Sequence, residues 1–183
     1  MRDVSLHILD IVENSLRAGA SLIQIDIAAD IPHDTLTVTI GDNGSGMSEE
    51  MLERVRSPFT TTRTTRKVGL GIPLFAAGCE NTGGHLEIES TLGQGTKLTA
   101  VYSFGHIDRP PLGNIAESIA SLVLANPQVD FVYTARKDET FEFDTRMIKA
   151  TLDGVAITEP SVMAFIREYL EEGTMQVFGG QDI

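Results

Sequence analysis

The chain has 183 residues, of which 42% are hydrophobic and 22% charged, so it can bury a core. Its net charge of −12 argues against a nucleic-acid-binding surface, because phosphate backbones require clustered Lys and Arg. A single cysteine, Cys79, excludes a disulfide framework and fits a buried packing thiol in a reducing cytoplasm. No run approaches the roughly 18 apolar residues of a membrane span, and the N-terminal residues lack the pattern of a signal peptide. We therefore expect a cytoplasmic protein with neither nucleic-acid nor membrane partners.

Hydrophobic periodicity predicts a helix over residues 4–18, capped by Asp3 and ended by Gly19. Two alternating segments, 22–27 and 36–40, are predicted as strands. The further elements expected before residue 107 are a helix over 48–56, a helix beginning just after Gly71, and strands near 85–90 and 96–104.

The composition changes at Asp108-Arg109-Pro110-Pro111, which predicts a linker. After it we expect a helix over 114–125, hairpin strands over 129–135 and 140–145, and a helix over 160–172. The chain is thus predicted to be an α+β protein with two parts, residues 1–107 and a small C-terminal α-β-β-α extension of unknown role over 112–183.

The first helix carries a polar face. Asp10, Asn14 and Arg17 are spaced i, i+4 and i+7, and His7 and Asp3 extend the same stripe. Taken alone, such a stripe is more often the solvated side of an amphipathic helix. His7, one turn before Asp10, is interpreted as a surface residue or as one that supports a neighbouring site.

The segment Asp42-Asn43-Gly44-Ser45-Gly46 follows the second strand. A carboxylate at a strand end can accept a hydrogen bond from an exocyclic amine such as adenine N6, and glycines beside it let a flat base approach the backbone. A plain turn is the alternative. A calcium loop is excluded because the alternating oxygen ligands and the later Glu are missing.

A second glycine element, Gly69-Leu70-Gly71, directly precedes a helix, where backbone N–H groups can bind phosphate oxygens. It has neither the third glycine of a dinucleotide fingerprint nor the Lys-Ser/Thr of a P-loop. The intervening segment 57–68 is rich in Thr and Arg and is interpreted as a lid over a triphosphate. Phe59 would anchor this lid, or would be an ordinary core residue.

In this order and spacing, the four segments resemble the N-box, G1-box, F-box and G2-box of the GHKL (Bergerat-fold) ATPases. The F-box segment is Pro58-Phe59-Thr60-Thr61-Thr62. The resemblance covers residues 5–104 and implies a two-layer α/β sandwich that binds ATP and Mg²⁺.

The resemblance also implies individual roles. Asn14 would coordinate magnesium, and Asp42 would hold adenine, with Thr96 assisting through water. Asp10 stands where many members carry a catalytic Glu, so it would be a shorter base and hydrolysis would be slow. The residues implied to line the nucleotide are Asn14, Arg17, Asp42, Gly44, Gly46, Met47, Phe59, Thr60, Thr61, Thr62, Gly69, Leu70, Gly71, Ile72 and Thr96.

The boxes resemble different members of the group. Glu13-Asn14-Ser15-Leu16 resembles MutL-type ATPases, as does the region 112–145, whereas the F-box and G2-box resemble histidine kinases. The helical hairpin that carries the phosphorylated His of self-contained histidine kinases has no room before His7.

Three functions are therefore compatible with the sequence. The first is a kinase module that phosphorylates a partner protein, on histidine or serine, in trans. The second is an ATP-gated switch or slow ATPase that controls dimerisation or partner binding. The third is a regulatory nucleotide-binding subunit of a larger enzyme. All three expect a protein partner, and the second allows a homodimer.

Overall fold

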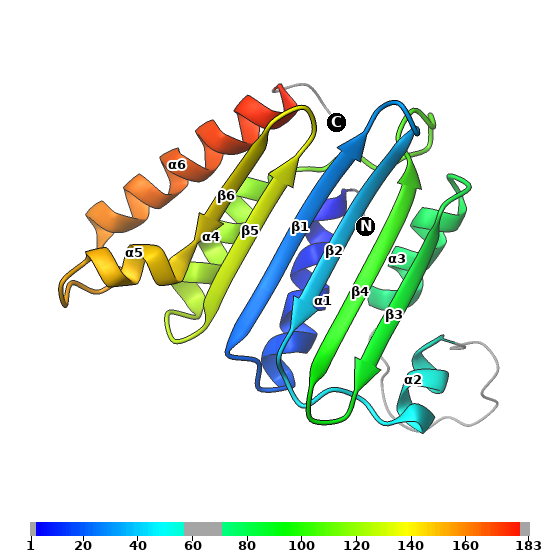
Figure 1. The fold of residues 1–183 in the computed structure, drawn as a ribbon, viewed down its shortest axis with the longest axis horizontal. Coiled ribbons are helices and arrows are strands. Elements are labelled where there is room, and N and C mark those ends of the chain that lie inside the picture. The colour runs from blue at the N-terminus through cyan, green and yellow to red at the C-terminus, as the bar shows by residue number, and fades with distance from the viewer. Residues whose placement is uncertain (1–2, 57–70, 180–183) are drawn as a thin grey trace.

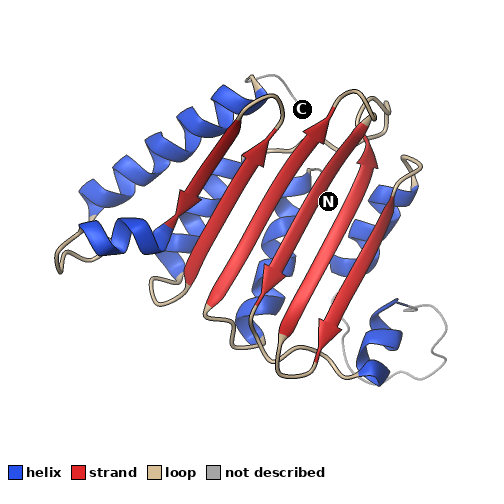
Figure 2. Cartoon of the chain, in the orientation of Figure 1, coloured by secondary structure: helices blue, strands red, loops and turns tan. Residues whose placement is uncertain are grey.

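The computed structural model describes residues 3–56 and 71–179, which form one six-stranded sheet with helices on one of its faces (Figures 1 and 2). The strands are β1 (Leu22–Asp30), β2 (Thr35–Asp42), β3 (His85–Thr91), β4 (Gly95–Ser103), β5 (Asp130–Arg136) and β6 (Thr140–Asp144). The helices are α1 (Val4–Arg17), α2 (Glu49–Arg56), α3 (Gly71–Glu80), α4 (Ile115–Ala125), α5 (Thr145–Thr151) and α6 (Pro160–Phe178). The strand order is β3-β4-β2-β1-β5-β6. The predicted α+β sandwich is therefore confirmed.

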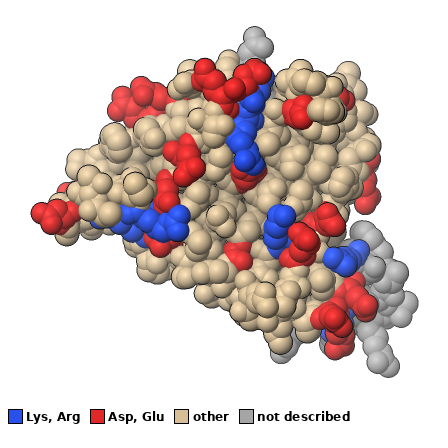
Figure 3. Space-filling view, in the orientation of Figure 1, with Lys and Arg blue, Asp and Glu red and all other residues tan. Residues whose placement is uncertain are grey.

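The core lies between the sheet and the helices, because alternate residues of each strand point to the same face. In β1, Ile23, Ile25 and Ile27 are fully buried, whereas Gln24 and Asp26 lie on the other face. That second face has no covering helix in the part of the chain described, and Figure 3 shows scattered charges across it. The sheet is thus covered on one face only, which is typical of an antiparallel arrangement.

The first helix begins and ends close to where the sequence predicts. Asp3 is its N-cap, and its Oδ1 accepts a hydrogen bond of 3.1 Å from the backbone N–H of Leu6. Ile8, Ile11 and Val12 bury their side chains against the sheet. This packing fixes which face of α1 remains available for polar contacts.

The C-terminal part continues the same sheet. Strand β5 pairs in parallel with β1, with Leu22 opposite Asp130, while all other neighbouring strands are antiparallel. Residues 112–179 therefore share a sheet with the N-terminal part. The division into residues 1–107 and 112–183 as separate domains stays a prediction about which part can fold alone.

Two C-terminal elements differ from the sequence prediction. Helix α6 runs to Phe178, and the short helix α5 was not predicted, since seven residues are too few to show a helical period. Gly173 of α6 lies against the ring of Phe141, and a Cβ at this position would come within 2.2 Å of that ring. Gly173 thus allows α6 to approach the sheet closely.

The single cysteine lies inside the core. Cys79 is fully buried in α3, and burial raises the pKa of its thiol to about 11. The thiol is therefore protonated at neutral pH and acts as a packing group, as the sequence predicts. Among residues 3–56 and 71–179, no helix has the length and hydrophobicity needed to cross a bilayer.

The tight contact at Gly173 gives a stability prediction. Gly173→Ala should lower the free energy of unfolding relative to Gly78→Ala by about 1–3 kcal/mol, because the added methyl group must displace the Phe141 ring. Gly78 is also helical, but among the described residues a Cβ added there would meet nothing closer than 3.8 Å. The Gly78→Ala variant therefore measures the gain in helix propensity alone. Urea denaturation of both variants measures the difference, and equal stabilities would contradict the packing.

Candidate nucleotide-binding site

The carboxylate of Asp42, at the end of β2, is held by two hydrogen bonds. Ser15 Oγ of α1 donates to Asp42 Oδ2 at 2.6 Å, and the Gly44 backbone N–H donates to Oδ1 at 2.8 Å. A carboxylate has about four acceptor positions, so these two bonds orient the group and leave acceptor capacity for a ligand amine. Asp42 is therefore fixed in direction before any ligand binds.

The ends of three strands meet around this carboxylate. Thr96 of β4 lies opposite Asp42, and Ser90 of β3 lies opposite Thr96. The Ser90 and Thr96 hydroxyl oxygens are 2.9 Å apart, and Ser90 Oγ also donates to the Gly95 carbonyl and accepts from the Met47 N–H, both at 2.9 Å. Met47, directly after the G1-box segment Asp42–Gly46, is thereby joined to the same strand end.

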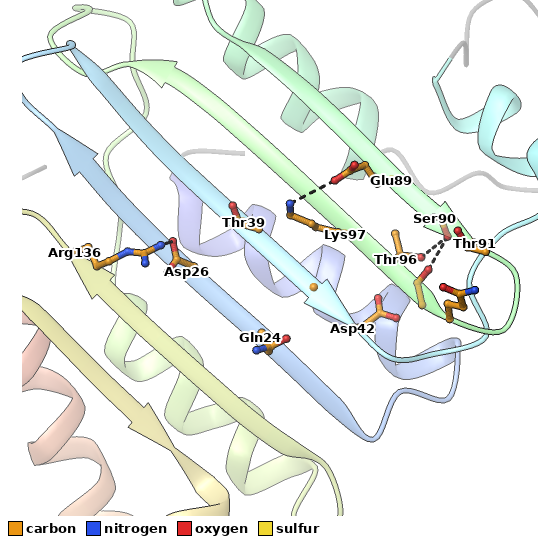
Figure 4. A pocket seen from close by; sticks show the side chains of 13 residues that line it. Gln24, Asp26, Thr39, Asp42, Glu89, Ser90, Thr91, Thr96, Lys97 and Arg136 are labelled. Carbon is orange, nitrogen blue, oxygen red and sulfur yellow. Dashed lines mark hydrogen bonds and ion pairs between the residues drawn. The ribbon is translucent and has the colours of Figure 1, made fainter.

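The site lies on the helix side of the sheet. Asp42 follows the buried Val38 and Ile40 at alternate positions of β2, so the three side chains share a face. A hollow of about 680 Å³ lies over the opposite face, where Asp26 pairs with Arg136 and Lys97 with Glu89 (Figure 4). That hollow shares only strand-end residues with the site around Asp42, and α1 and α3 lie on the other side of the sheet.

Glycine is required where the chain passes the strand ends. Gly46 has a φ of +62°, and a Cβ there would lie 2.1 Å from the Thr91 carbonyl oxygen. Gly95 has a φ of +109°, and its Cβ would lie 1.9 Å from the Asp42 carbonyl oxygen. Both contacts involve backbone atoms, so no side-chain movement could relieve them. The second glycine of the G1 segment is thus needed for the loop's own packing, before any base approaches it.

The N-box helix also contacts the start of α3. Gly71 is the first residue of α3, and a Cβ on it would lie 3.0 Å from Asp10 Oδ2 and 3.1 Å from Asp10 Cβ. The half-buried Asp10 carboxylate therefore lies beside the N-terminal turn of α3. The N–H groups of that turn carry a partial positive charge that favours anions.

The other two polar residues of the N-box are exposed. Asn14 is exposed, and Arg17 forms an ion pair with Glu13, one turn earlier on α1. Both partners are more than half exposed, so the pair contributes little stability and Arg17 can exchange it for another anion. Asp10, Asn14 and Arg17 thus share a helix face, as predicted, and within residues 3–56 and 71–179 Asp10 contacts another box through Gly71.

Of the two roles predicted for His7, a surface residue or one that supports a neighbouring site, the structure rules out the surface position. Its side chain is only 4% exposed and stacks on Phe75 of α3, with ring centroids 4.7 Å apart and planes 9° apart. The cause is α3, which covers the N-terminal half of the polar stripe of α1. Among the described residues, His7 Nδ1 has no hydrogen-bond partner. Burial lowers the pKa of His7 below its ordinary value.

Several predicted site residues lie outside the described part of the chain: Phe59, Thr60, Thr61, Thr62, Gly69 and Leu70. Their assignment stays a prediction, together with the lid over 57–68. Ile72 and Met47 are described and are half-buried against the core. Gly44 is buried, and a Cβ there would come 2.9 Å from the Ala18 carbonyl oxygen.

Sequence reasoning missed three polar residues that build the site. They are Ser15, Ser90 and Asn43, whose Oδ1 accepts from the Ser21 and Leu22 N–H groups at 2.9 Å each. A signal for Ser15 was present, because it lies four residues after Ile11 on the buried stripe of α1. A buried hydroxyl within an apolar stripe needs a partner elsewhere.

The fold and the site together define a domain in which polar residues of three strand ends and of α1 meet around one carboxylate. Residues 2–105 match the family model described as "Histidine kinase-, DNA gyrase B-, and HSP90-like ATPase". This match covers more than half of the chain, and the protein therefore belongs to this family, the GHKL ATPases.

Curated relatives are similar over the same region. The chain is 32% identical over 96 residues to histidine protein kinase DivJ of Caulobacter vibrioides, which covers 50% of this chain and 16% of DivJ. It is 33% identical over 110 residues to sensor protein kinase FleS of Pseudomonas aeruginosa, covering 60% and 27% respectively. The chain thus spans well under a third of the length of these relatives.

Solved structures show a similar fold beyond that region. The Aquifex aeolicus MutL ATPase domain complexed with ADP superimposes with a TM-score of 0.52 at 18% identity, covering 94% of this chain and 70% of that one. The N-terminal domain of a DNA repair protein gives a TM-score of 0.52 at 14% identity, covering 79% and 52%. The superposition on the MutL domain covers 94% of this chain and so includes most of the C-terminal part. The similarity in fold therefore extends beyond residues 2–105, which match the family model.

The buried His7 predicts a pH dependence of stability. Because its pKa is lower in the folded state, the unfolded chain binds a proton more readily than the folded chain once the pH falls below the ordinary value of 6.5. The free energy of unfolding should therefore decrease from pH 7.5 to about pH 5.5, and His7→Phe should remove this part of the decrease. Urea denaturation across this range measures it, with His33→Phe, at an exposed position, as the control. An unchanged pH profile in His7→Phe would contradict the assignment.

Proposed function

We propose that the protein binds Mg·ATP in the pocket around Asp42 and uses it to transfer a phosphoryl group to a partner protein. The observation that carries the proposal is the fixed Asp42 carboxylate, held by Ser15 and Gly44 with acceptor capacity to spare. An oriented acceptor at the end of a buried strand suits the exocyclic amine of adenine. Guanine presents a carbonyl oxygen at the equivalent position, which would meet this carboxylate as a second acceptor.

The remaining groups fit a nucleotide placed from Asp42 towards α3. Thr96, opposite Asp42, offers a hydroxyl near the base. The N-terminal turn of α3 at Gly71 offers N–H groups for phosphate oxygens. Asn14 offers an exposed amide oxygen, which is a ligand type that Mg²⁺ accepts. In this arrangement Arg17 leaves Glu13 and pairs with phosphate.

Asp10 is the candidate base. It lies beside the first turn of α3, one helical turn before Asn14, so it would be close to phosphates bound there. In a transfer to a hydroxyl, Asp10 would accept the hydroxyl proton as the oxygen attacks the γ-phosphorus and ADP leaves. The similarity to DivJ and FleS, both protein kinases, supports a kinase role.

A second candidate function is an ATP-gated switch with slow hydrolysis. The observation that favours it is the MutL-like fold over 94% of the chain, in which β5 extends the ATPase sheet by parallel pairing with β1. Through this pairing, a change at the end of β1 or β2 would be transmitted to the C-terminal part. Phosphate transfer to a partner distinguishes the kinase from a switch, which would change only its oligomeric or partner-bound state.

The first functional prediction concerns recognition of the adenine base by Asp42. The parent should bind ATP more tightly than GTP, and Asp42→Asn should weaken ATP binding by about 1–3 kcal/mol, the value of a lost hydrogen bond to a charged group. Asp34→Asn is a matched control, because Asp34 accepts from Ser103 Oγ at 2.6 Å and from the Gly105 N–H at 2.7 Å, far from the pocket. Calorimetric titration measures these affinities. Equal affinities of the parent for ATP and GTP would contradict the assignment of Asp42 to the adenine amine.

The second concerns magnesium. Asn14→Ala should remove most of the Mg²⁺ dependence of ATP binding and leave the unfolding curve unchanged, because Asn14 is exposed on α1. Asn81→Ala, an exposed Asn in the turn after α3, serves as the control. Titrations with ATP in Mg²⁺ and in EDTA measure the effect. A variant that keeps the full Mg²⁺ dependence would show that another group holds the ion.

The third concerns catalysis. The isolated protein should release phosphate slowly, Asp10→Glu should increase the rate, and Asp10→Asn should abolish release without weakening ATP binding. The Asp side chain is one methylene shorter than Glu, so we expect it to position the nucleophile poorly. The rate of phosphoryl transfer falls steeply when the nucleophile is misplaced. Steady-state phosphate release at saturating ATP measures all three. Phosphate release by Asp10→Asn at the parent's rate would show that another residue is the catalytic base.

A further inference from the structure

An apolar groove lies at the edge of the sheet formed by β6, between that strand, α5 and α6. It has a volume of about 730 Å³ and is lined mainly by Met147, Ile148, Leu152, Val162, Phe165 and Tyr169. Met147 is 70% exposed and Phe165 56% exposed. Large apolar side chains gathered at this exposure are typical of interaction surfaces.

Aromatic contacts support the exposed Phe165 ring that lines the groove. Phe165 stacks on Tyr169 with ring centroids 5.8 Å apart, and Tyr169 packs edge-on against Phe141 at 5.0 Å. Tyr169 also lies near the fully buried Phe143. The exposed Phe165 is therefore a supported ring at the end of a chain of aromatic contacts that reaches the core. A fixed aromatic anchor loses little conformational entropy when a ligand covers it.

The rim of the groove is acidic. Glu142 lines it directly, and helical spacing places Glu168 three residues after Phe165 and Glu172 three residues after Tyr169, along the same edge of α6. Within residues 3–56 and 71–179, none of these three carboxylates forms an ion pair.

The cations near the groove are already paired within the chain. Arg146 is bound to Asp144, Lys149 to Asp130, and Arg167 to Glu117. In Figure 3 the left part of the surface, over α5 and α6, is largely uncharged, with acidic side chains at its margins and a group of Lys or Arg side chains over α5. The groove therefore combines an apolar floor with unneutralised negative charge along its rim.

We infer that this groove binds an amphipathic helix of a partner protein, with apolar residues on one face and Lys or Arg beside them. Apolar grooves of this kind take amphipathic helices through apolar anchors three and four residues apart. The charge selects a basic partner, since opposite potentials across an interface favour association. A second copy of this chain would bring an acidic rim against an acidic rim. The inference does not depend on the nucleotide assignment.

The test uses the full chain and two synthetic amphipathic helices of about 18 residues, enough for about five turns. One has leucines on one face and lysines on the other, and the second has glutamates in place of the lysines. The Leu/Lys peptide should bind at 0.15 M salt and the Leu/Glu peptide should not. Fluorescence anisotropy measures both. Equal binding of the two peptides would overturn the inference.

Two sets of variants locate the binding. Phe165→Ser should weaken the Leu/Lys peptide about tenfold or more, whereas Met175→Ser, at an equally exposed position on another side of α6, should not. The double variant Glu168→Gln/Glu172→Gln should weaken binding and reduce its salt dependence. Glu49→Gln/Glu53→Gln on α2 removes the same charge elsewhere and should leave the affinity unchanged.

The alternative occupants give different results. If the groove binds a second copy of the chain, sedimentation will show a dimer of the parent that Phe165→Ser dissociates, and the inference is then wrong. If the peptide binds through charge alone, the glutamate variants on α2 and α6 will act alike and Phe165→Ser will have no effect, which also overturns it.

Discussion

The interaction on which the site depends is the pair of hydrogen bonds that orient Asp42. Ser15 Oγ reaches the carboxylate from the buried face of α1, and the Gly44 N–H reaches it from the loop that follows β2. A hydrogen bond to a charged group contributes about 1.5–3 kcal/mol, so this contact also ties the first helix to the sheet. The acceptor for the proposed adenine amine is therefore positioned by the same packing that forms the core.

The close backbone contacts around Asp42 follow from the same constraint. The turn at Gly46 passes the Thr91 carbonyl, and the start of β4 at Gly95 passes Asp42 itself, at distances that leave no space for a side chain. On the other side, Asp10 lies against Gly71. The N-box helix thus contacts the strand ends through Ser15 and the start of α3 through Asp10. The β6 edge of the sheet carries the apolar groove, so the proposed nucleotide and partner sites would lie on different strands of one sheet, with the parallel β1–β5 pair between them.

The sequence predicted most of the architecture because its signals are local. The periodicity of α1, the alternation in β1 and β2, and the Asp3 cap each depend on neighbouring residues, and the structure confirms them. The parallel pairing of β5 with β1 could not be predicted, since the strands lie about a hundred residues apart and no short motif specifies it. The sequence left open whether His7 lies at the surface or supports a neighbouring site, because a helical stripe does not reveal that Phe75 of α3 stacks on it. Ser15 was overlooked because its role depends on a carboxylate from a distant strand, although its position on the apolar stripe was a usable signal.

The most direct test of this account asks whether Asp42 contacts the 6-amino group of adenine. ATP and purine riboside triphosphate, which lacks only that amine, are titrated into the parent and into Asp42→Asn. The account predicts that the parent binds ATP more tightly than the analogue by about 1–3 kcal/mol, and that this difference largely disappears in Asp42→Asn. The same difference in both proteins would show that Asp42 does not contact the amine, and would contradict the central claim.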